Sequence, residues 1–257
     1  MKQLTKQWIN KWLEGLGQIT FLFQEIIRSI FSRNINGRDL IYQLHFVGVK
    51  SQSVVLITGA FTGMVLAAQT YFQFHKVKMD TATLAVVSVS MCSELGPVLT
   101  ALMVSGRVGA AMAAELGSMR VTEQIDALRT LATHPVDYLV VPRFAATLIA
   151  MPLLAVESIV VGISAGYQVG VHLLKIDPTY LWVNMLRYTA PQDVLAGLAK
   201  AIIFGGIISL ISCYKGIHCG EGAEGVGRAT TEAVVYASIT VLITNFFLTL
   251  VMNRLLG

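Results

Sequence analysis

Long apolar stretches separated by short polar segments dominate this chain. Windows without any charged residue cover 51–75, 81–93, 144–156, 158–174, 201–214 and 233–253. Several of them approach the ~20 apolar residues that a helix needs to cross a bilayer. The pattern therefore predicts an all-α polytopic membrane protein with five transmembrane helices.

The spans are expected at about 53–74, 81–119, 138–174, 194–214 and 233–256. The second is too long for one upright helix, because its 39 residues at about 1.5 Å each would extend roughly 58 Å. Gly96-Pro97 lies inside it and predicts a kink or a discontinuity. A hairpin at this dipeptide would give a six-span alternative. Polar connections are expected at 175–193 and, rich in glycine, at 216–227.

The first 48 residues are expected to be helical without crossing the membrane, and we divide the chain into an N-terminal region, 1–48, and a membrane domain, 49–257. Trp8, Trp12, Leu16 and Ile19 recur at helical spacing, which favours a helix in the headgroup plane. The alternative is a soluble amphipathic helix packed on something else. A turn is expected at 34–37, and no cleavable signal peptide is evident.

A short polar helix is expected at 121–134, between the second and third spans. Thr122 is its predicted N-cap. Ile125, Leu128, Leu131 and Ala132 form an apolar stripe, and Glu123 and Asp126 lie elsewhere on the helix. The position favours a docking helix for another protein over a surface helix that merely covers loop ends.

Composition and charge support the same class of protein. Only 13% of the residues are charged, against about 25% in soluble domains. With the N-terminus in the cytoplasm, inside segments hold twelve Lys and Arg residues and outside segments five, as the positive-inside rule requires. The basic residues are spread along loops, which argues against nucleic acid as a partner. The three cysteines lack metal-ligand spacing.

Apart from Arg143 and Arg254, which we count with the flanking segments, five charged residues lie within the predicted spans, where charge is costly and is usually functional or paired. Glu94, just before the kink, is either a polar point on a substrate path or a carboxylate at a helix end. Arg107 and Glu115 are separated by about 12 Å along one helix face, so each needs another partner. We interpret them, with Glu157, as structural buried charges. Lys200 could pair with Glu157, reach the interface, or attract an anionic headgroup.

Enzyme motifs are absent from the sequence. It has no P-loop, no G-x-S-x-G and no H-E-x-x-H, and its five histidines are scattered. We therefore expect no catalytic residues, no metal site and no cofactor, and we expect any ATP hydrolysis to take place in a partner subunit.

The run ELGPVLTALMVSGRVGAAMAAELGSMRVTEQIDAL, at 94–128, resembles the signature of the MlaE/YrbE permease family, and GAEGVGRATTEAVV resembles that family's loop before the last span. These permeases are the membrane subunits of ABC transporters that move phospholipids between the inner and outer membranes of bacteria. The resemblance covers most of the chain.

The resemblance implies a homodimer in the bacterial inner membrane that works with a cytoplasmic ABC ATPase and a periplasmic MCE-domain protein. Helix 121–134 would be the coupling helix, with Glu123, Gln124 and Asp126 facing the ATPase. The lipid cavity between the two copies would be lined by Glu94 and by Leu66, Gln69, Thr70 and Phe74. Many family members have an arginine where this chain has Ser93, and we hypothesise that Lys200 supplies the missing cation.

Two other functions compete with a lipid permease. An ion-coupled secondary transporter would use Glu94, Arg107 and Glu157 as a relay, but the chain shows no convincing inverted repeat. A membrane scaffold would need neither the intramembrane charges nor the kink. Substitution of Ile125 or Leu128 by aspartate would test the docking helix.

Overall fold

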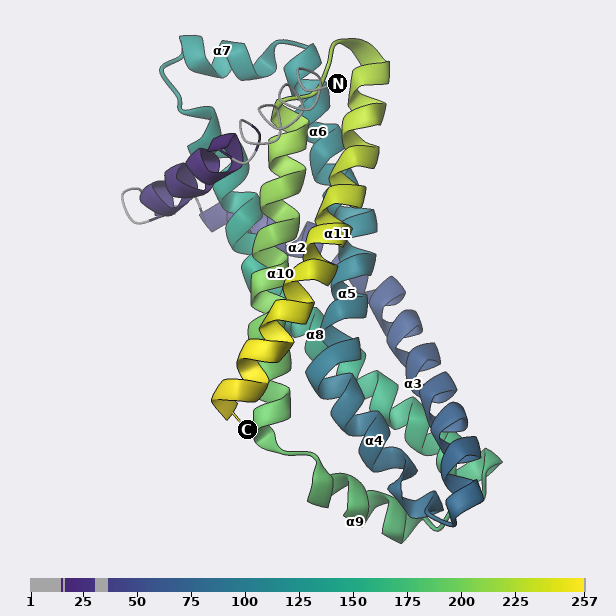
Figure 1. Cartoon of the computed structure of the whole chain (residues 1–257). Coiled ribbons are helices and arrows are strands. Elements are labelled where there is room, and N and C mark those ends of the chain that lie inside the picture. The colour runs from purple at the N-terminus through teal and green to yellow at the C-terminus, as the bar shows by residue number, and fades with distance from the viewer. Residues whose placement is uncertain (1–14, 16, 31–36, 257) are drawn as a thin grey trace, which may run out of the picture.

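The computed structural model describes residues 15, 17–30 and 37–256, and every element in these ranges is helical (Figure 1). Five helical runs are long and apolar enough to cross a membrane: Gly37–Val77, Asp80–Val121, Val136–Leu173, Pro191–Ile217 and Gly222–Arg254. The predicted all-α, five-span membrane protein is thereby confirmed. The predicted stripe at Trp8, Trp12 and Leu16 and most of the turn at 34–37 lie outside the described residues.

The first run joins α2 (Gly37–Val47) to α3 (Gln52–Phe74) through a short 3-10 turn. The second run is one uninterrupted helix from α4 (Thr83–Ser90) through α5 (Gly96–Val104) to α6 (Ala110–Val121). Two π-helical turns, η4 (Met91–Leu95) and η5 (Ser105–Gly109), join these three segments. The sequence at Gly96-Pro97 thus forms neither a break nor a hairpin, which excludes six spans.

The third run contains α8 (Val141–Gln168), which packs against α3 without intervening side chains. A Cβ on Gly63 would overlap the carbonyl of Gly162, and a Cβ on Gly59 would lie 2.8 Å from the carbonyl oxygen of Ser158. Close approach of this kind maximises van der Waals contact where no hydrophobic effect drives helices together. It fixes α3 against the rest of the bundle.

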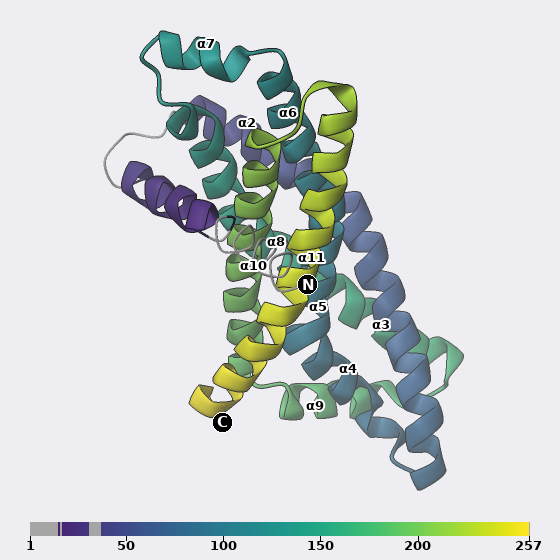
Figure 2. The same ribbon diagram turned by 45° about the horizontal axis from the view of Figure 1, so that its top comes forward.

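The last two spans, α10 (Pro191–Ile217) and α11 (Gly222–Leu256), are antiparallel neighbours (Figures 1 and 2). α11 begins well before the predicted start at residue 233, so most of the expected glycine-rich loop is helical. Gly222 adopts φ +71° just as the helix begins. Gly225 lies so close to the Gly220 backbone that no Cβ would fit. Glycine is therefore needed for the tight turn between α10 and α11. The close backbone packing at this turn outweighs the ~1 kcal/mol by which glycine disfavours a helix.

Two short helices lie at opposite ends of the bundle (Figures 1 and 2). α7 (Gln124–Thr130) is shorter than the predicted helix 121–134. The predicted N-cap is wrong: Glu123, at φ 58°, precedes the helix, and the Thr122 hydroxyl donates to the Ser118 carbonyl instead. At the other end, α9 (Pro178–Tyr188) occupies the expected polar connection, and the Asp177 carboxylate caps its first turn.

A hydrophobic cluster ties the α7 end of the molecule together. It joins the helix at 17–30 to α6, α7, α8 and α10 through Leu22, Ile26, Leu116, Ile125, Leu139, Val140, Val141, Phe144 and Cys213. Helix 17–30 nevertheless leaves Phe21 and Ile27 exposed on its other side. Such a two-sided helix beside membrane spans is typical of an interfacial position.

Candidate functional site: an ion-pair network beside a cavity

The centre of the candidate site is Lys200 on α10, which is almost completely buried. Its Nζ lies 2.5 Å from Glu94 Oε1, 3.1 Å from the Ser93 carbonyl oxygen and 2.9 Å from Thr249 Oγ1. An ammonium has three N–H donors, so these three contacts use all of them. A buried charge is tolerated when it is fully paired in this way.

Glu94 lies in the π turn η4 and receives further hydrogen bonds from α11. Asn245 Nδ2 donates to its Oε2 at 3.0 Å, and the Thr249 hydroxyl lies 2.7 Å from Oε1. The carboxylate is a third exposed, in contrast to the lysine. Glu94 is therefore held in place by two spans and still presents an edge to its surroundings.

Pro97 and the π turn η4 both leave the Ser93 carbonyl without its usual α-helical donor. In an α-helix the N–H of residue 97 would donate to the carbonyl of residue 93, but proline has no N–H. The ammonium of Lys200 donates to that oxygen instead. The hypothesis that Lys200 supplies a cation beside Ser93 thus agrees with the geometry, and the contact could not be read from the sequence.

A cavity of about 490 Å³ adjoins this network. Its lining includes Glu94 and Lys200, Gln192 and Asp193 from the first turn of α10, and Met252 and Asn253 near the end of α11. These helix ends lie opposite α7 (Figure 1). The site thus combines a charged group, supporting amides and hydroxyls, and a cavity at one end of the bundle.

The predicted path residues on α3 do not line this cavity within one chain. Leu66 is partly buried in a cluster with α4 and α9 residues, and Thr70 is buried. Gln69 is exposed and Phe74 is half-buried. The structure therefore brings together Glu94 and Lys200 from the predicted set, while the four α3 positions stay predictions.

The remaining intramembrane charges have separate partners. Arg107 donates to Ser51 Oγ at 2.7 Å and lies over the ring of Phe46, which anchors η5 to the start of α3. Glu115 pairs with Arg143 at 3.0 Å, and Glu157 accepts from Gln52 at 2.9 Å. The possible Glu157–Lys200 pair does not form. Glu94, Arg107 and Glu157 have separate partners and do not contact one another directly.

The expectation that these charges are buried needs correction, because Arg107 and Glu157 are only partly buried and Glu115 is exposed. The Glu115 side chain is 45% exposed, whereas its partner Arg143 is 8% exposed. Sequence reasoning missed Arg143, and it missed Asn245 and Thr249. The signal for the last two was a pair of polar residues one helical turn apart in an apolar span.

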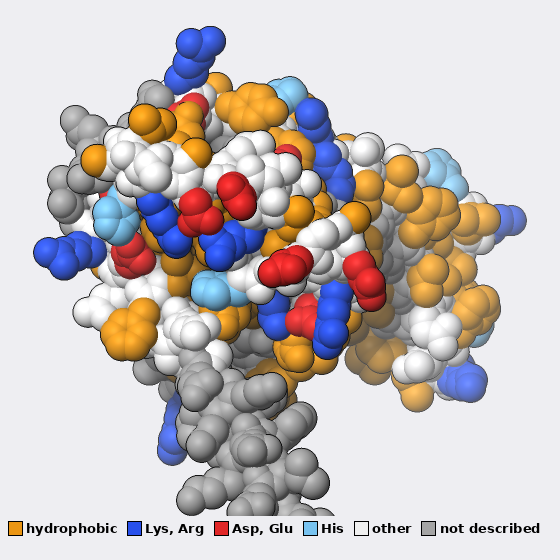
Figure 3. Space-filling view, turned by 90° about the horizontal axis from the view of Figure 1, so that it is seen from above, with side chains coloured by type: hydrophobic (Ala, Val, Ile, Leu, Met, Phe, Trp, Pro, Cys, Tyr) orange, Lys and Arg blue, Asp and Glu red, His pale blue; other side chains and the backbone are white. Residues whose placement is uncertain are grey.

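α7 presents a different kind of surface. Ile125 is buried in the chain's own cluster and cannot face a partner, and Leu128 is partly buried against the same cluster. Asp126 pairs with Arg120 and Arg129. Glu123, Gln124 and Leu131 are exposed. Viewed from this end, the molecule shows acidic, basic and histidine side chains close together (Figure 3).

A five-span bundle with a polar cavity at one end and an exposed helix between spans at the other defines a polytopic membrane protein that has the parts a permease needs. The family model described as "Permease MlaE" matches residues 40–251 of this chain. The chain therefore belongs to the MlaE permease family and is a permease subunit.

Named relatives agree with this membership. A probable ABC transporter permease protein of Rickettsia felis is 46% identical, covering 93% of this chain and 92% of the relative. A probable ABC transporter permease protein of Synechocystis is 41% identical, with 95% and 93% covered. The intermembrane phospholipid transport system permease protein MlaE of Haemophilus influenzae is 38% identical, with 83% and 82% covered.

Proposed function

We propose that this permease moves phospholipids between the inner and outer membranes, with Glu94 as the polar contact for the lipid headgroup. The observation that carries the proposal is the Glu94–Lys200 network beside the cavity. Because Lys200 uses its three donors within the network, it positions Glu94 rather than meeting the lipid. The printed name of the Haemophilus relative supports the substrate class.

The energy would come from ATP hydrolysis in a separate cytoplasmic subunit that docks on α7. The names of the relatives support an ABC partner. Glu123, Gln124 and Leu131 are among the exposed residues of α7 and its flanks, and we assign the contact to these residues. Ile125 and Leu128 would transmit movement inward, since they pack on the cluster that joins helix 17–30, α6 and α8.

The subunit would act as a homodimer with a periplasmic MCE-domain protein, in the bacterial inner membrane with its N-terminus in the cytoplasm. α11 supports the dimer, because the part of this helix beside the cavity exposes the apolar side chains of Phe247, Leu250 and Val251. The orientation is supported by the Lys and Arg count, which places α7 inside.

The test is lipid transfer by the chain reconstituted with its ATPase and MCE-domain partners in liposomes. Glu94→Gln should reduce ATP-dependent transfer of a fluorescent phospholipid at least ~10-fold, the scale of one lost charge-assisted contact. Asp80→Asn, which neutralises a carboxylate outside the cavity, is the control and should transfer normally. Unchanged transfer by Glu94→Gln would refute the assignment. Transfer driven by an ion gradient without ATP would favour a secondary transporter.

A further inference from the structure

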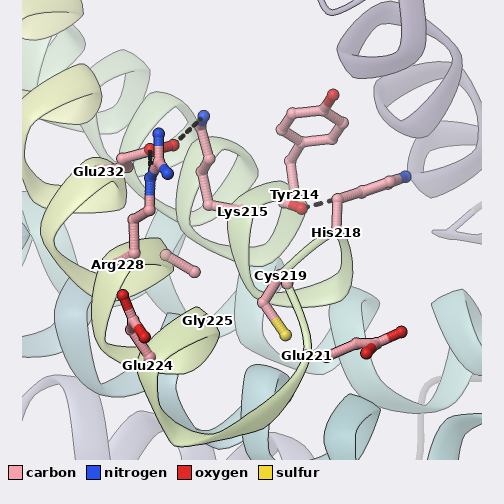
Figure 4. Close-up of a pocket in the computed structure, with 11 residues that line it drawn as sticks. Tyr214, Lys215, His218, Cys219, Glu221, Glu224, Gly225, Arg228 and Glu232 are labelled. Atoms are coloured by element: carbon pink, nitrogen blue, oxygen red, sulfur yellow. Dashed lines mark hydrogen bonds and ion pairs between the residues drawn. The ribbon is translucent and has the colours of Figure 1, made fainter.

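A second cavity of about 410 Å³ lies at the α7 end, between the last turn of α10, the connecting loop and the first turns of α11 (Figure 4). Tyr214, Lys215 and His218 line one side of it, and Glu224, Arg228 and Glu232 line the other. It is separate from the Glu94 cavity, whose walls come from the second span and from the opposite ends of the same two helices.

Two cations in this cavity share one carboxylate. Glu232 Oε2 lies 2.8 Å from Lys215 Nζ, and its Oε1 lies 3.0 Å from Arg228 Nε. The group therefore keeps one positive charge in excess. Arg228 is 83% exposed and uses one of its five N–H donors in this contact. The remaining donors can bind a phosphate in the forked geometry that guanidinium favours.

Two carboxylates at the rim of the cavity carry negative charge that no cation among the described residues offsets. Glu221 and Glu224 are exposed, and neither forms an ion pair within the part of the chain that the structure describes. Glu224 lies one helical turn before Arg228, and Figure 4 shows Arg228 between Glu232 and Glu224. The cavity thus offers a cationic group beside an anionic one, which complements a zwitterion.

The cavity lies at the depth of lipid headgroups. The stretch of α11 from Val235 to Met252 is free of charge and about 26 Å long, close to the ~30 Å hydrocarbon core. Lys215 lies 4.3 Å above the ring of Tyr236 at the start of this stretch, and aromatic rings of this kind mark the membrane interface. Next to it, Ile239, Leu242 and Phe246 expose an apolar track that acyl chains could follow.

We propose that this cavity binds an amine-bearing zwitterionic phospholipid of the adjoining leaflet. Its phosphate is held by Arg228 and Lys215, its ammonium by Glu224 and Glu221, and its acyl chains lie along α11. A primary ammonium donates hydrogen bonds to the carboxylates, which a trimethylated amine cannot do. The site therefore selects phosphatidylethanolamine over phosphatidylcholine. This inference rests on the membrane location of the chain and does not depend on the direction or energy source of transport.

The rate at which Cys219 is modified measures how much of the cavity is occupied by lipid. Cys219 lines the cavity and is half-exposed, whereas Cys92 and Cys213 are buried. The full chain is placed in nanodiscs of phosphatidylcholine, with or without an equimolar share of phosphatidylethanolamine of the same acyl chains. A water-soluble maleimide then modifies Cys219, followed by mass spectrometry. Phosphatidylethanolamine should slow the reaction about tenfold if it occupies ~90% of the sites. The phosphatidylcholine discs should give the same rate as the chain without a protecting lipid.

Variants separate the parts of the proposal. Glu221→Gln with Glu224→Gln should remove the protection by phosphatidylethanolamine, and Arg228→Gln should weaken it while Lys215 still pairs with Glu232. Glu94→Gln, in the other cavity, should leave it unchanged.

Equal protection by both lipids, or protection that survives the double variant, would overturn recognition of the amine. Equal protection by soluble glycerophosphoethanolamine would overturn the lipid assignment. Protection that requires the ATPase subunit instead of lipid would show that a protein contact fills the cavity.

Discussion

Lys200 and Glu94 form an ion pair between the fourth and second spans, with Nζ 2.5 Å from Oε1 and the lysine almost fully buried. The pair is more than a favourable contact, because each partner would be a buried or half-buried charge without the other. It also ties α11 to both spans through Thr249 and Asn245. Positioning of the carboxylate and stability of the bundle therefore depend on the same atoms.

Removal of only one partner should be more harmful than removal of both charges. Lys200→Met leaves Glu94 without its cation and the Ser93 carbonyl without the Lys200 donor, and it should destabilise the protein by about 3–5 kcal/mol. Lys200→Met with Glu94→Gln should recover part of that loss but should not restore transfer. Thermal unfolding in detergent and lipid transfer measure the two effects. A double variant no more stable than Lys200→Met would show that the pair is not coupled.

The α3–α8 contact has no room for an added methyl group, so even a glycine-to-alanine substitution there should lower stability. Gly63→Ala places a Cβ on the Gly162 carbonyl and should destabilise the protein by about 1–3 kcal/mol through overpacking. Gly227→Ala in α11 is the matched control, since a Cβ there meets nothing within 4 Å, and it should stabilise by roughly 0.5–1 kcal/mol. Equal melting temperatures for the two variants would contradict the packing.

Two apolar residues near α7 should separate docking from folding. Ile125→Ala empties a buried position and should cost about 2–5 kcal/mol. Leu131→Asp changes a side chain that is 74% exposed, so stability should stay within about 0.5 kcal/mol of wild type while the ATPase no longer co-purifies. Normal co-purification of Leu131→Asp would place the ATPase contact elsewhere.

Glu157 should be replaceable with a gain in stability. Among the residues that the structure describes, its Oε2 is buried without a hydrogen-bond partner, and Oε1 accepts from Gln52. Glu157→Gln keeps the acceptor and removes a charge that costs about 2.5–3.5 kcal/mol at the middle of a span, so the melting temperature should rise. Gln52→Ala takes this donor away and should lower the melting temperature. The opposite order would indicate that the charge itself stabilises the bundle.

Cys219 should be the one native cysteine that a polar maleimide modifies, and its reaction should be slow at neutral pH. Burial raises the pKa of the Cys219 thiol above its usual value, and only the thiolate reacts. The rate should therefore keep rising with pH where that of a free cysteine has levelled off. Mass spectrometry of the native and the denatured chain checks both statements. Modification of Cys92 or Cys213 without denaturant would contradict their burial.

The sequence by itself determined the class of protein, the number of spans and the approximate bounds of each. It did so because each span must by itself be apolar over about twenty residues to cross the bilayer, and this property can be read locally from the sequence. It also identified Glu94 and Lys200 as unusual, since intramembrane charges are rare whatever their partners.

Only the tertiary structure decided which of these charges meet. Lys200 lies opposite Glu94 rather than Glu157 because α10 packs against the second span at η4, which brings the ammonium to Glu94 and to the Ser93 carbonyl. Glycine contacts likewise turned an expected loop into the start of α11. Ile125 became a core residue although its stripe looked available to a partner. Such outcomes join residues far apart in the chain, and local patterns carry no information on which helix faces come together.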